Sequence, residues 1–196
     1  MPESEAFCRR CRLHETRTQV VVGQGNPAAE VMFLGEAPGR QEDLLGRGFQ
    51  GAAGKVFEDI LAFVGLRRAD IWLANAVRCR PSVDGKRNRA PQSTEILACH
   101  HWLAADLERV HPQVVVTLGR VAFESLTGLA WDGETRRAAP FKPPGDSWEA
   151  FGLYHPAYLI YRRDLKNMYR GDLIALRTLL ADRGIPIEPA DGTWAQ

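Results

Sequence analysis

The chain has 196 residues, of which 45% are hydrophobic and 25% charged, so it is long enough for one ordinary globular domain. Its 25 Lys and Arg nearly cancel its 24 Asp and Glu, which gives a net charge of +1. This balance excludes a protein that binds nucleic acid through overall positive charge, but it allows a local basic patch. No secretory signal and no membrane-spanning run of about 18 apolar residues is found. We therefore expect a single, monomeric, cytoplasmic domain over 1–196.

Short apolar runs alternate with amphipathic segments along the chain. In order, the pattern predicts a strand at 30–34, a helix at 55–64, a strand at 71–77, a helix at 92–110, a strand at 113–118, a helix at 120–127, a strand at 151–154 and a helix at 164–183. Loops are expected at 35–54, 78–91 and 129–148, with a frayed tail at 185–196. This alternation predicts an α/β fold with three layers, α/β/α, around a central, mostly parallel four-stranded sheet.

Polar side chains stand where three of the predicted strands end. Glu36 follows the first strand, Asn75 lies near the end of the second, and His155 follows the fourth. Ligands of parallel sheets bind beyond the carboxyl ends of the strands, so these three side chains could meet in one crevice. On spacing alone, satisfied polar groups in loops are an equally good interpretation of Asn75 and His155.

Four cysteines carry the clearest spacing signal. Cys8 and Cys11 are separated by two residues, while Cys79 and Cys99 lie farther along the chain. In a reducing compartment, four thiols are better explained as metal ligands than as two disulfides. The spacing fits a tetrahedral zinc site or a [4Fe–4S] cluster and does not separate the two. Four unrelated core thiols are the remaining alternative.

Several motifs follow one another in a recognisable order: CRRC at 8–11, GEAPG at 35–39, FQGAAG at 49–54, NAVRCRP at 75–81 and HPA at 155–157. Together they closely resemble the family 4 uracil-DNA glycosylases, the iron–sulfur branch of that superfamily, over about residues 8–180. The resemblance implies a DNA repair enzyme that flips uracil out of DNA and hydrolyses its N-glycosidic bond, leaving an abasic site. It also implies that the four cysteines hold a [4Fe–4S] cluster, with zinc as the alternative.

The resemblance also assigns the residues that would bind uracil. Asn75 matches the Asn that reads the base, because a carboxamide can pair with O4 and N3–H together. Phe49 would stack on the face of the base, and Gly35 is expected to lie against it. A plain core aromatic is the alternative for Phe49.

Three further residues are candidates for the chemical step. His155 matches the family's motif His and would donate a hydrogen bond to O2 as negative charge builds there. Glu36 and Glu42 are the candidate carboxylates for guiding water and stabilising the cationic sugar, and Glu42 is also a candidate for excluding the 5-methyl group of thymine. A loop ion pair is the alternative for Glu36.

Two basic stretches lie beside the predicted crevice. Residues 78–89 carry five basic side chains against one acid, and residues 162–170 carry four against one. We expect them to contact the phosphates of uracil-containing DNA, single- or double-stranded, although solvated surface charge is the usual role of such runs. Leu159 is the first candidate for an apolar wedge between bases, and Tyr158 the second. The expected DNA-binding residues are Arg80, Arg87, Arg89, Leu159 and Arg162.

Two other functions remain open from the sequence. A related branch of the superfamily binds uracil in DNA and traps its product covalently, but it carries a His in a basic insert, whereas residues 85–89 here contain none. The other function is a non-catalytic, metal-stabilised module that binds nucleic acid.

Overall fold

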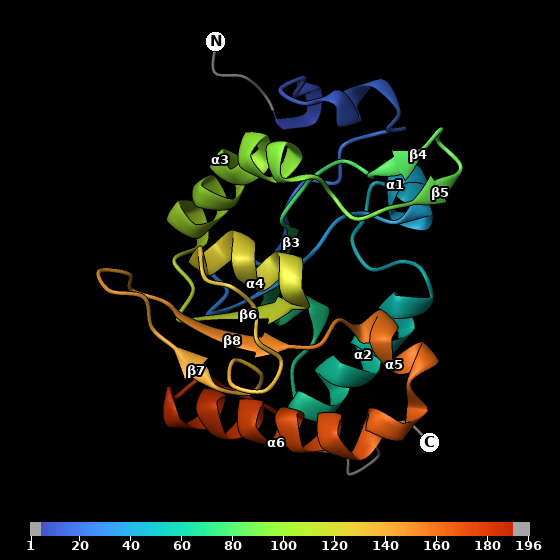
Figure 1. Cartoon of the computed structure of the whole chain (residues 1–196). Coiled ribbons are helices and arrows are strands. Elements are labelled where there is room, and N and C mark those ends of the chain that lie inside the picture. Colours follow the sequence, from blue (N-terminus) through green and yellow to red (C-terminus); the bar gives the residue numbers. More distant parts are fainter. Residues whose placement is uncertain (1–4, 190–196) are drawn as a thin grey trace.

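The computed structural model describes residues 5–189 of the chain. Its strands are β1 (Gln24–Gly25), β2 (Val31–Gly35), β3 (Ile71–Asn75), β4 (Ser82–Val83), β5 (Arg87–Asn88), β6 (Val114–Leu118), β7 (Pro140–Phe141) and β8 (Glu149–Leu153). Six of them form one sheet in the order β1-β3-β2-β6-β8-β7 (Figure 1). The four inner strands are parallel, and the outer strands β1 and β7 pair antiparallel.

The predicted fold class is confirmed, but the predicted number of strands is wrong. The described residues contain the four expected parallel strands at the centre of a six-stranded sheet. The two extra strands, β1 and β7, have two residues each. Segments that short leave no alternation of apolar and polar residues, so only their pairing with a longer neighbour reveals them.

The inner strands form because their residues suit a position that is buried on both faces. Residues 31–35 read VMFLG and residues 114–118 read VVVTL, and every one of them is buried. Successive side chains point to opposite faces, so Phe33 joins one apolar cluster while Met32 and Leu34 join the other. The sheet therefore needs a helical layer on each face.

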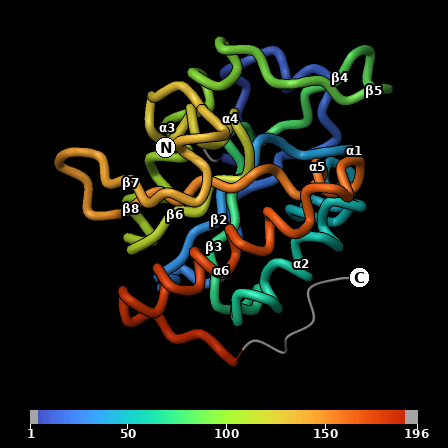
Figure 2. Tube along the Cα trace, turned by 60° about the horizontal axis from the view of Figure 1, so that its bottom comes forward, coloured from blue at the N-terminus to red at the C-terminus, as the bar shows by residue number. Residues whose placement is uncertain are grey.

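Helices supply these two layers. The α-helices are α1 (Arg40–Leu45), α2 (Ala52–Val64), α3 (Ser93–Val110), α4 (Arg120–Thr127), α5 (Pro156–Tyr161) and α6 (Lys166–Asp182). Helices α2 and α6 lie side by side over the face that Phe33 points to, as Figure 2 shows, and α5 packs against α2. Helices α3 and α4 cover the opposite face.

Three short elements were not predicted from the sequence: α1 and the β4–β5 hairpin lie in segments expected to be loops, and α5 lies between the predicted strand at 151–154 and the predicted helix at 164–183. Helices α1 and α5 have six residues each, and β4 pairs with β5 in a two-stranded hairpin. A helix of six residues shows too little of the 3.6-residue period to be recognised. The short 3₁₀ helices are η1 (Glu5–Phe7), η2 (Arg12–Glu15), η3 (Arg68–Asp70) and η4 (Arg163–Leu165).

The first residues of the predicted frayed tail, 185–189, contact the rest of the domain. Ile185 is buried in the core, and the N–H of Glu188 donates to the carbonyl oxygen of Gly65 at 2.9 Å. The rest of that predicted tail, residues 190–196, lies outside the described residues. Among the described helices, none is both long and apolar enough to cross a membrane.

Candidate active site

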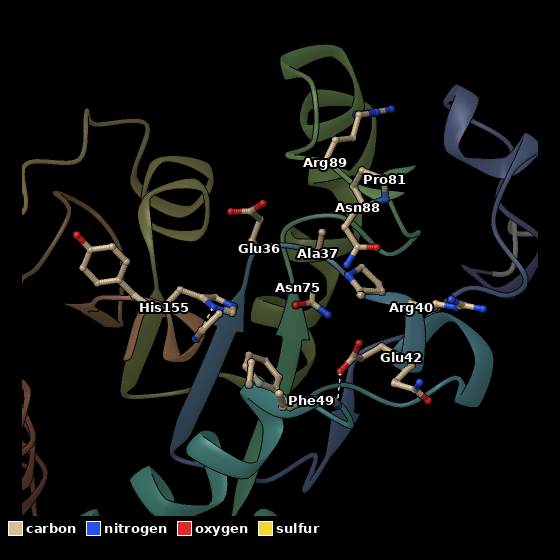
Figure 3. A pocket seen from close by; sticks show the side chains of 18 of the residues that line it. Glu36, Ala37, Arg40, Glu42, Phe49, Asn75, Pro81, Asn88, Arg89 and His155 are labelled. Atoms are coloured by element: carbon tan, nitrogen blue, oxygen red, sulfur yellow. Dashed lines mark hydrogen bonds between the residues drawn. The ribbon is translucent and has the colours of Figure 1, made fainter. Parts of the chain in front are cut away.

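A cavity of about 610 Å³ opens at the carboxyl ends of β2, β3 and β8 (Figure 3). The loop after β2 lines it with Glu36, β3 with its last residue Asn75, and the segment after β8 with His155. Phe49 lines it from the loop before α2, and Asn88 from the β4–β5 hairpin. The structure thus brings together the polar side chains that follow three separate strands.

Asn75 presents an uncommitted carboxamide to this cavity. It is 5% exposed, and its side chain makes no hydrogen bond to any described residue, while its backbone carbonyl accepts one from Arg78. Gly35 makes room for it, because a Cβ at position 35 would come within 2.4 Å of Oδ1 of Asn75. Gly35 itself therefore acts as the spacer that lets the amide and the Phe49 ring approach the strand end.

Phe49 is held in an unusual backbone conformation beside the cavity. Its φ angle is +54°, in the left-handed region, where a residue other than glycine costs about 1–3 kcal/mol. The ring centroid lies 4.6 Å from that of Phe57 and 5.9 Å from that of His155, nearly parallel to the imidazole. Gly54 is required behind it, since a Cβ there would meet the carbonyl oxygen of Phe49 at 2.1 Å.

His155 is fixed in one protonation state by its surroundings. It caps the N-terminus of α5, where its Nδ1 accepts a hydrogen bond from the backbone N–H of Ala157 at 3.1 Å. Burial lowers the pKa of the imidazole to about 4, against a weaker opposing effect of Glu42. At neutral pH the ring is uncharged, and because Nδ1 is the acceptor, the proton sits on Nε2, which can donate.

The two glutamates of the first motif are placed differently. Glu36 is half-buried, and desolvation raises its pKa while Arg120 opposes the rise. Its carboxylate makes no hydrogen bond to a described residue. Glu42 is already engaged, because its Oε1 accepts from the N–H groups of Gln50 and Gly51 at 2.7 and 2.9 Å. Only Glu36 therefore offers an uncommitted carboxylate here.

Much of the first basic stretch is engaged within the protein, contrary to expectation. Arg80 is 5% exposed and donates to Oδ1 of Asn88 at 2.7 Å and to two hairpin carbonyls, so it ties the hairpin together instead of meeting phosphate. Arg78 is fully buried and pairs with Asp106. Arg89 pairs with Glu95 through its two terminal nitrogens, Nη1 and Nη2, at 2.8 and 2.6 Å.

Arg87 differs from its basic neighbours in the same stretch. It lies in β5 of the hairpin, and its side chain is exposed. Of the arginines expected to bind DNA from this stretch, it is the one whose charge is presented to solvent. The sequence could not separate it from Arg80, since both lie in the same basic segment, which was expected to be a loop.

The structure contradicts Leu159 as the exposed wedge. Residues 156–161 form a helix, and Leu159 lies on its buried face, 5% exposed, within the core. Tyr158 and Tyr161 lie three residues apart on the outer face, are 40% and 82% exposed, and line the cavity. Arg162 follows them, exposed and paired with Asp164 at 2.8 Å.

The sequence carried a signal for this helix that was missed. Pro156 occupies its first turn directly after the capping His155, a combination that favours a helix start. In such a helix, residues three apart, such as Tyr158 and Tyr161, lie on the same face. Asn88 was also missed as a cavity residue, and no sequence signal marks it, because its position depends on the hairpin.

Four cysteines line a separate small cavity between the N-terminal segment and α3: Cys8, Cys11, Cys79 and Cys99. Arg17 donates to Sγ of Cys79 at 3.1 Å, and the backbone N–H of Arg78 donates to Sγ of Cys99 at 3.3 Å. Burial raises the pKa of the Cys99 thiol to about 12. Within residues 5–189, no three His, Cys, Asp or Glu side chains lie close enough together to hold one metal ion.

Comparison with known proteins now decides the family. A family model described as the uracil DNA glycosylase superfamily matches residues 22–175, and a Type-4 uracil-DNA glycosylase of Archaeoglobus fulgidus is 41% identical over 172 residues, covering 84% of each chain. The chain belongs to the type-4 uracil-DNA glycosylase family.

Two other relatives agree with this assignment. A Type-4 uracil-DNA glycosylase of Saccharolobus solfataricus is 33% identical over 191 residues, covering 92% of this chain and 85% of the relative. One of Thermotoga maritima is 34% identical over 185 residues, covering 90% and 91%. The resemblance noted in the sequence motifs is confirmed, and it extends over most of the chain.

Proposed function

We propose that this chain is a monofunctional uracil-DNA glycosylase of DNA repair, which hydrolyses the N-glycosidic bond of uracil in DNA and leaves an abasic site. Membership of the family and the activity for which its relatives are named support this reaction. One structural observation carries it furthest: an uncommitted carboxamide, an imidazole that can donate from Nε2 and an uncommitted carboxylate line one cavity.

Asn75 reads the base in this proposal. Uracil offers the acceptor O4 beside the donor N3–H, and a carboxamide offers a donor beside an acceptor. The buried amide has no hydrogen-bond partner among residues 5–189, so uracil would satisfy it. With the amide oxygen facing N3–H, cytosine, which has the reversed pattern, would leave buried groups unpaired. Such a mismatch costs about 1–3 kcal/mol for each unpaired group.

Phe49 acts on the face of the flipped base, and His155 acts at its edge. The Phe49 ring, near-parallel to the imidazole, provides a stacking surface. The Nε2–H of His155 would donate to O2, where charge accumulates as the bond to the sugar breaks. Because the imidazole is neutral at rest, it stabilises this charge as a hydrogen-bond donor and needs no proton transfer.

Glu36 is the carboxylate that we assign to the water and to the cationic sugar. Its carboxylate is half-buried and uncommitted, and a raised pKa makes it a better proton acceptor. We assign Glu42 to holding the loop at Gln50 and Gly51 rather than to the chemical step.

DNA, single- or double-stranded, would be held at the edge of the cavity. Tyr158 and Tyr161 present aromatic faces that can stack on neighbouring bases, in place of the buried Leu159. Arg87 and Arg162 are exposed, and each directly adjoins a residue that lines the cavity, Asn88 and Tyr161, so both suit phosphate contacts. A monomer acting in the cytoplasm stays our prediction.

We propose that the cysteine cavity holds a [4Fe–4S] cluster, with a zinc ion as the alternative. Zinc needs all of its sulfur ligands about 2.3 Å from one point, whereas a cluster takes one thiolate at each of its separated irons. The four thiols line one cavity, and N–H groups donate to two of the sulfurs. The cluster would join the N-terminal segment, the loop after β3 and α3, as a structural support.

The decisive experiment uses an oligonucleotide with one uracil opposite guanine. We expect strand cleavage at the uracil after treatment with the protein and then alkali, and none when thymine replaces uracil. Protein that contains its full complement of iron and sulfide yet leaves the strand intact would overturn the proposal. A DNA complex that survives SDS would favour covalent trapping, and a colourless protein with stoichiometric zinc would overturn the cluster.

A further inference from the structure

The loop that carries Phe49 is a thin wall between two hollows. Phe49 and Gly51 line the base cavity, and both also line a second cavity of about 530 Å³ behind the loop. A wall with open space on both sides cannot be held by packing alone. Since Phe49 also has a left-handed backbone, the loop needs specific bonds to keep its ring in place.

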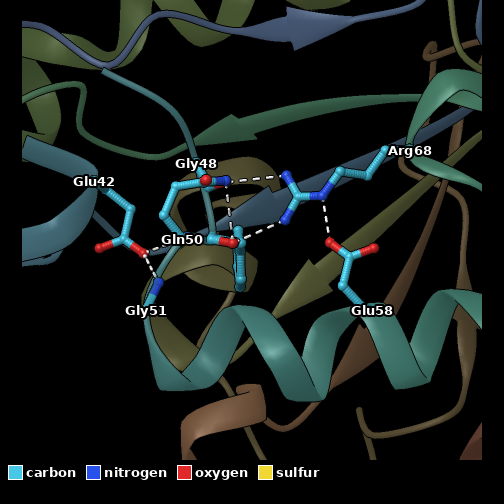
Figure 4. Close-up of polar contacts among 7 residues, drawn as sticks. Glu42, Gly48, Gln50, Gly51, Glu58 and Arg68 are labelled. Carbon is cyan, nitrogen blue, oxygen red and sulfur yellow. Dashed lines mark hydrogen bonds and ion pairs between the residues drawn. The ribbon is translucent and has the colours of Figure 1, made fainter. Parts of the chain in front are cut away.

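Arg68 supplies these bonds from the rear cavity (Figure 4). Its Nη1 donates to the carbonyl oxygen of Gly48 at 3.0 Å, and its Nη2 donates to that of Phe49 at 2.8 Å. Its Nε pairs with the carboxylate of Glu58 on α2, and the guanidinium lies 5.5 Å from the centroid of the Phe57 ring. Every nitrogen of the guanidinium is therefore used, and helix α2 sets its orientation.

The opposite side of the loop is held by Glu42. Its carboxylate accepts from the N–H groups of Gln50 and Gly51, directly after the carbonyls that Arg68 binds. A cation thus binds the loop's carbonyls from behind, while an anion binds its amides from the base cavity. Each ionic group meets backbone dipoles of the complementary sign, which strengthens both sets of hydrogen bonds.

We propose that Arg68, oriented by Glu58, is a positioning residue that holds the Phe49 ring against the base site and so determines how firmly the flipped uracil is stacked. This inference rests on the proposed function for its kinetic consequence. Neither side chain touches the base, because both lie on the rear side of the loop. Their effect passes through the carbonyls of Gly48 and Phe49 and through the Phe57 ring, against which Phe49 packs.

The first test is a double-mutant cycle with Phe49 in single-turnover excision. We expect Arg68→Ala to lower the excision rate about tenfold, a loss within the range of one stacking contact, with unchanged affinity for DNA that lacks uracil. In the Phe49→Ala background, Arg68→Ala should cost nothing further, because the ring it positions is gone. Equal losses in both backgrounds, or no loss in either, would overturn the proposal.

The chain offers a matched control and a graded series. Arg67→Ala removes the neighbouring arginine, which pairs with Asp70 and does not contact the loop, so the rate should stay unchanged. Arg68→Lys should restore only part of the loss, since one ammonium cannot replace the guanidinium fork. Glu58→Gln, which leaves Arg68 in place, should give a smaller loss of the same non-additive kind, and full activity there would count against the orienting role of Glu58.

A second measurement does not depend on activity. Hydrogen exchange of the amides of 48–51 should be faster in Arg68→Ala than in wild type and unchanged in Arg67→Ala. If the wild type failed to excise uracil, the proposed function would fall while this readout still decided the anchoring. Unchanged exchange in Arg68→Ala would overturn the anchoring even in a fully active enzyme.

Discussion

The cavity's floor, formed by Asn75, Phe49 and His155, and its rim, which includes Asn88 and Tyr161, hold their side chains in different ways. Each floor residue is buried or fixed by backbone bonds: Asn75 ends a strand, and His155 accepts a hydrogen bond from the helix that it caps. The rim residues are exposed, Tyr161 by 82%. The floor is therefore preorganised for one base, while the rim can adapt to a variable strand.

The largest effect should come from the carboxylate above the floor. We expect Glu36→Gln to lower the excision rate about 10²- to 10⁴-fold, the range of general acid–base catalysis. Because burial raises the pKa of Glu36, the pH profile of the wild type should have an acid limb, in which activity falls as Glu36 is protonated. This limb should begin at a higher pH than the usual pKa of a carboxyl group would give. The imidazole of His155 stays neutral down to about pH 4, so it does not cause this limb.

Single-turnover rates across the acidic range check this assignment. The acid limb should disappear in Glu36→Gln and persist in Glu42→Gln, whose amide oxygen still accepts from the loop. A limb that persists in Glu36→Gln and vanishes in Glu42→Gln would transfer the role to Glu42.

The next effect compares two carboxamides that line the same cavity. Asn75→Ala should lower the excision rate about 10²-fold, because a buried pair of hydrogen bonds to the base is lost. Asn88→Ala, on the exposed hairpin, should cost much less, since its side chain serves mainly to bind Arg80. Rates at saturating protein measure both, and equal losses would erase the distinction between floor and rim.

This distinction also explains which parts the sequence could predict. The inner strands are mostly apolar, so their ends could be predicted to within about two residues, and side chains at or just after those ends, such as Asn75 and His155, meet at one edge of the parallel sheet. The burial of Arg80 and Leu159 depends on a hairpin and a helix of a few residues each. Elements that short are set by tertiary contacts, which local periodicity does not contain.

The buried and exposed faces of helix α5 can be tested as a pair. Leu159→Ala should lower the free energy of unfolding by about 2–5 kcal/mol and leave the excision rate of the folded protein unchanged. Tyr161→Ala should do the reverse, with unchanged stability and about tenfold weaker binding to uracil-containing DNA. Denaturant unfolding and binding titrations measure these effects. If Leu159→Ala lost DNA binding but kept full stability, Leu159 would be the side chain that inserts between bases.

The smallest effect concerns two arginines of the hairpin region. Arg87→Ala removes an exposed charge, so DNA affinity should fall a few-fold and the slope of log K against log salt should decrease in magnitude by about 1, as for one lost phosphate contact. Arg80→Ala removes a buried side chain whose donors all bind the hairpin, so it should loosen β4 and β5 while the salt slope changes little. A salt titration of both variants separates a phosphate contact from an internal brace. If Arg80→Ala alone changed the slope, its guanidinium would have to leave the hairpin on binding, and the rim would reorganise around DNA.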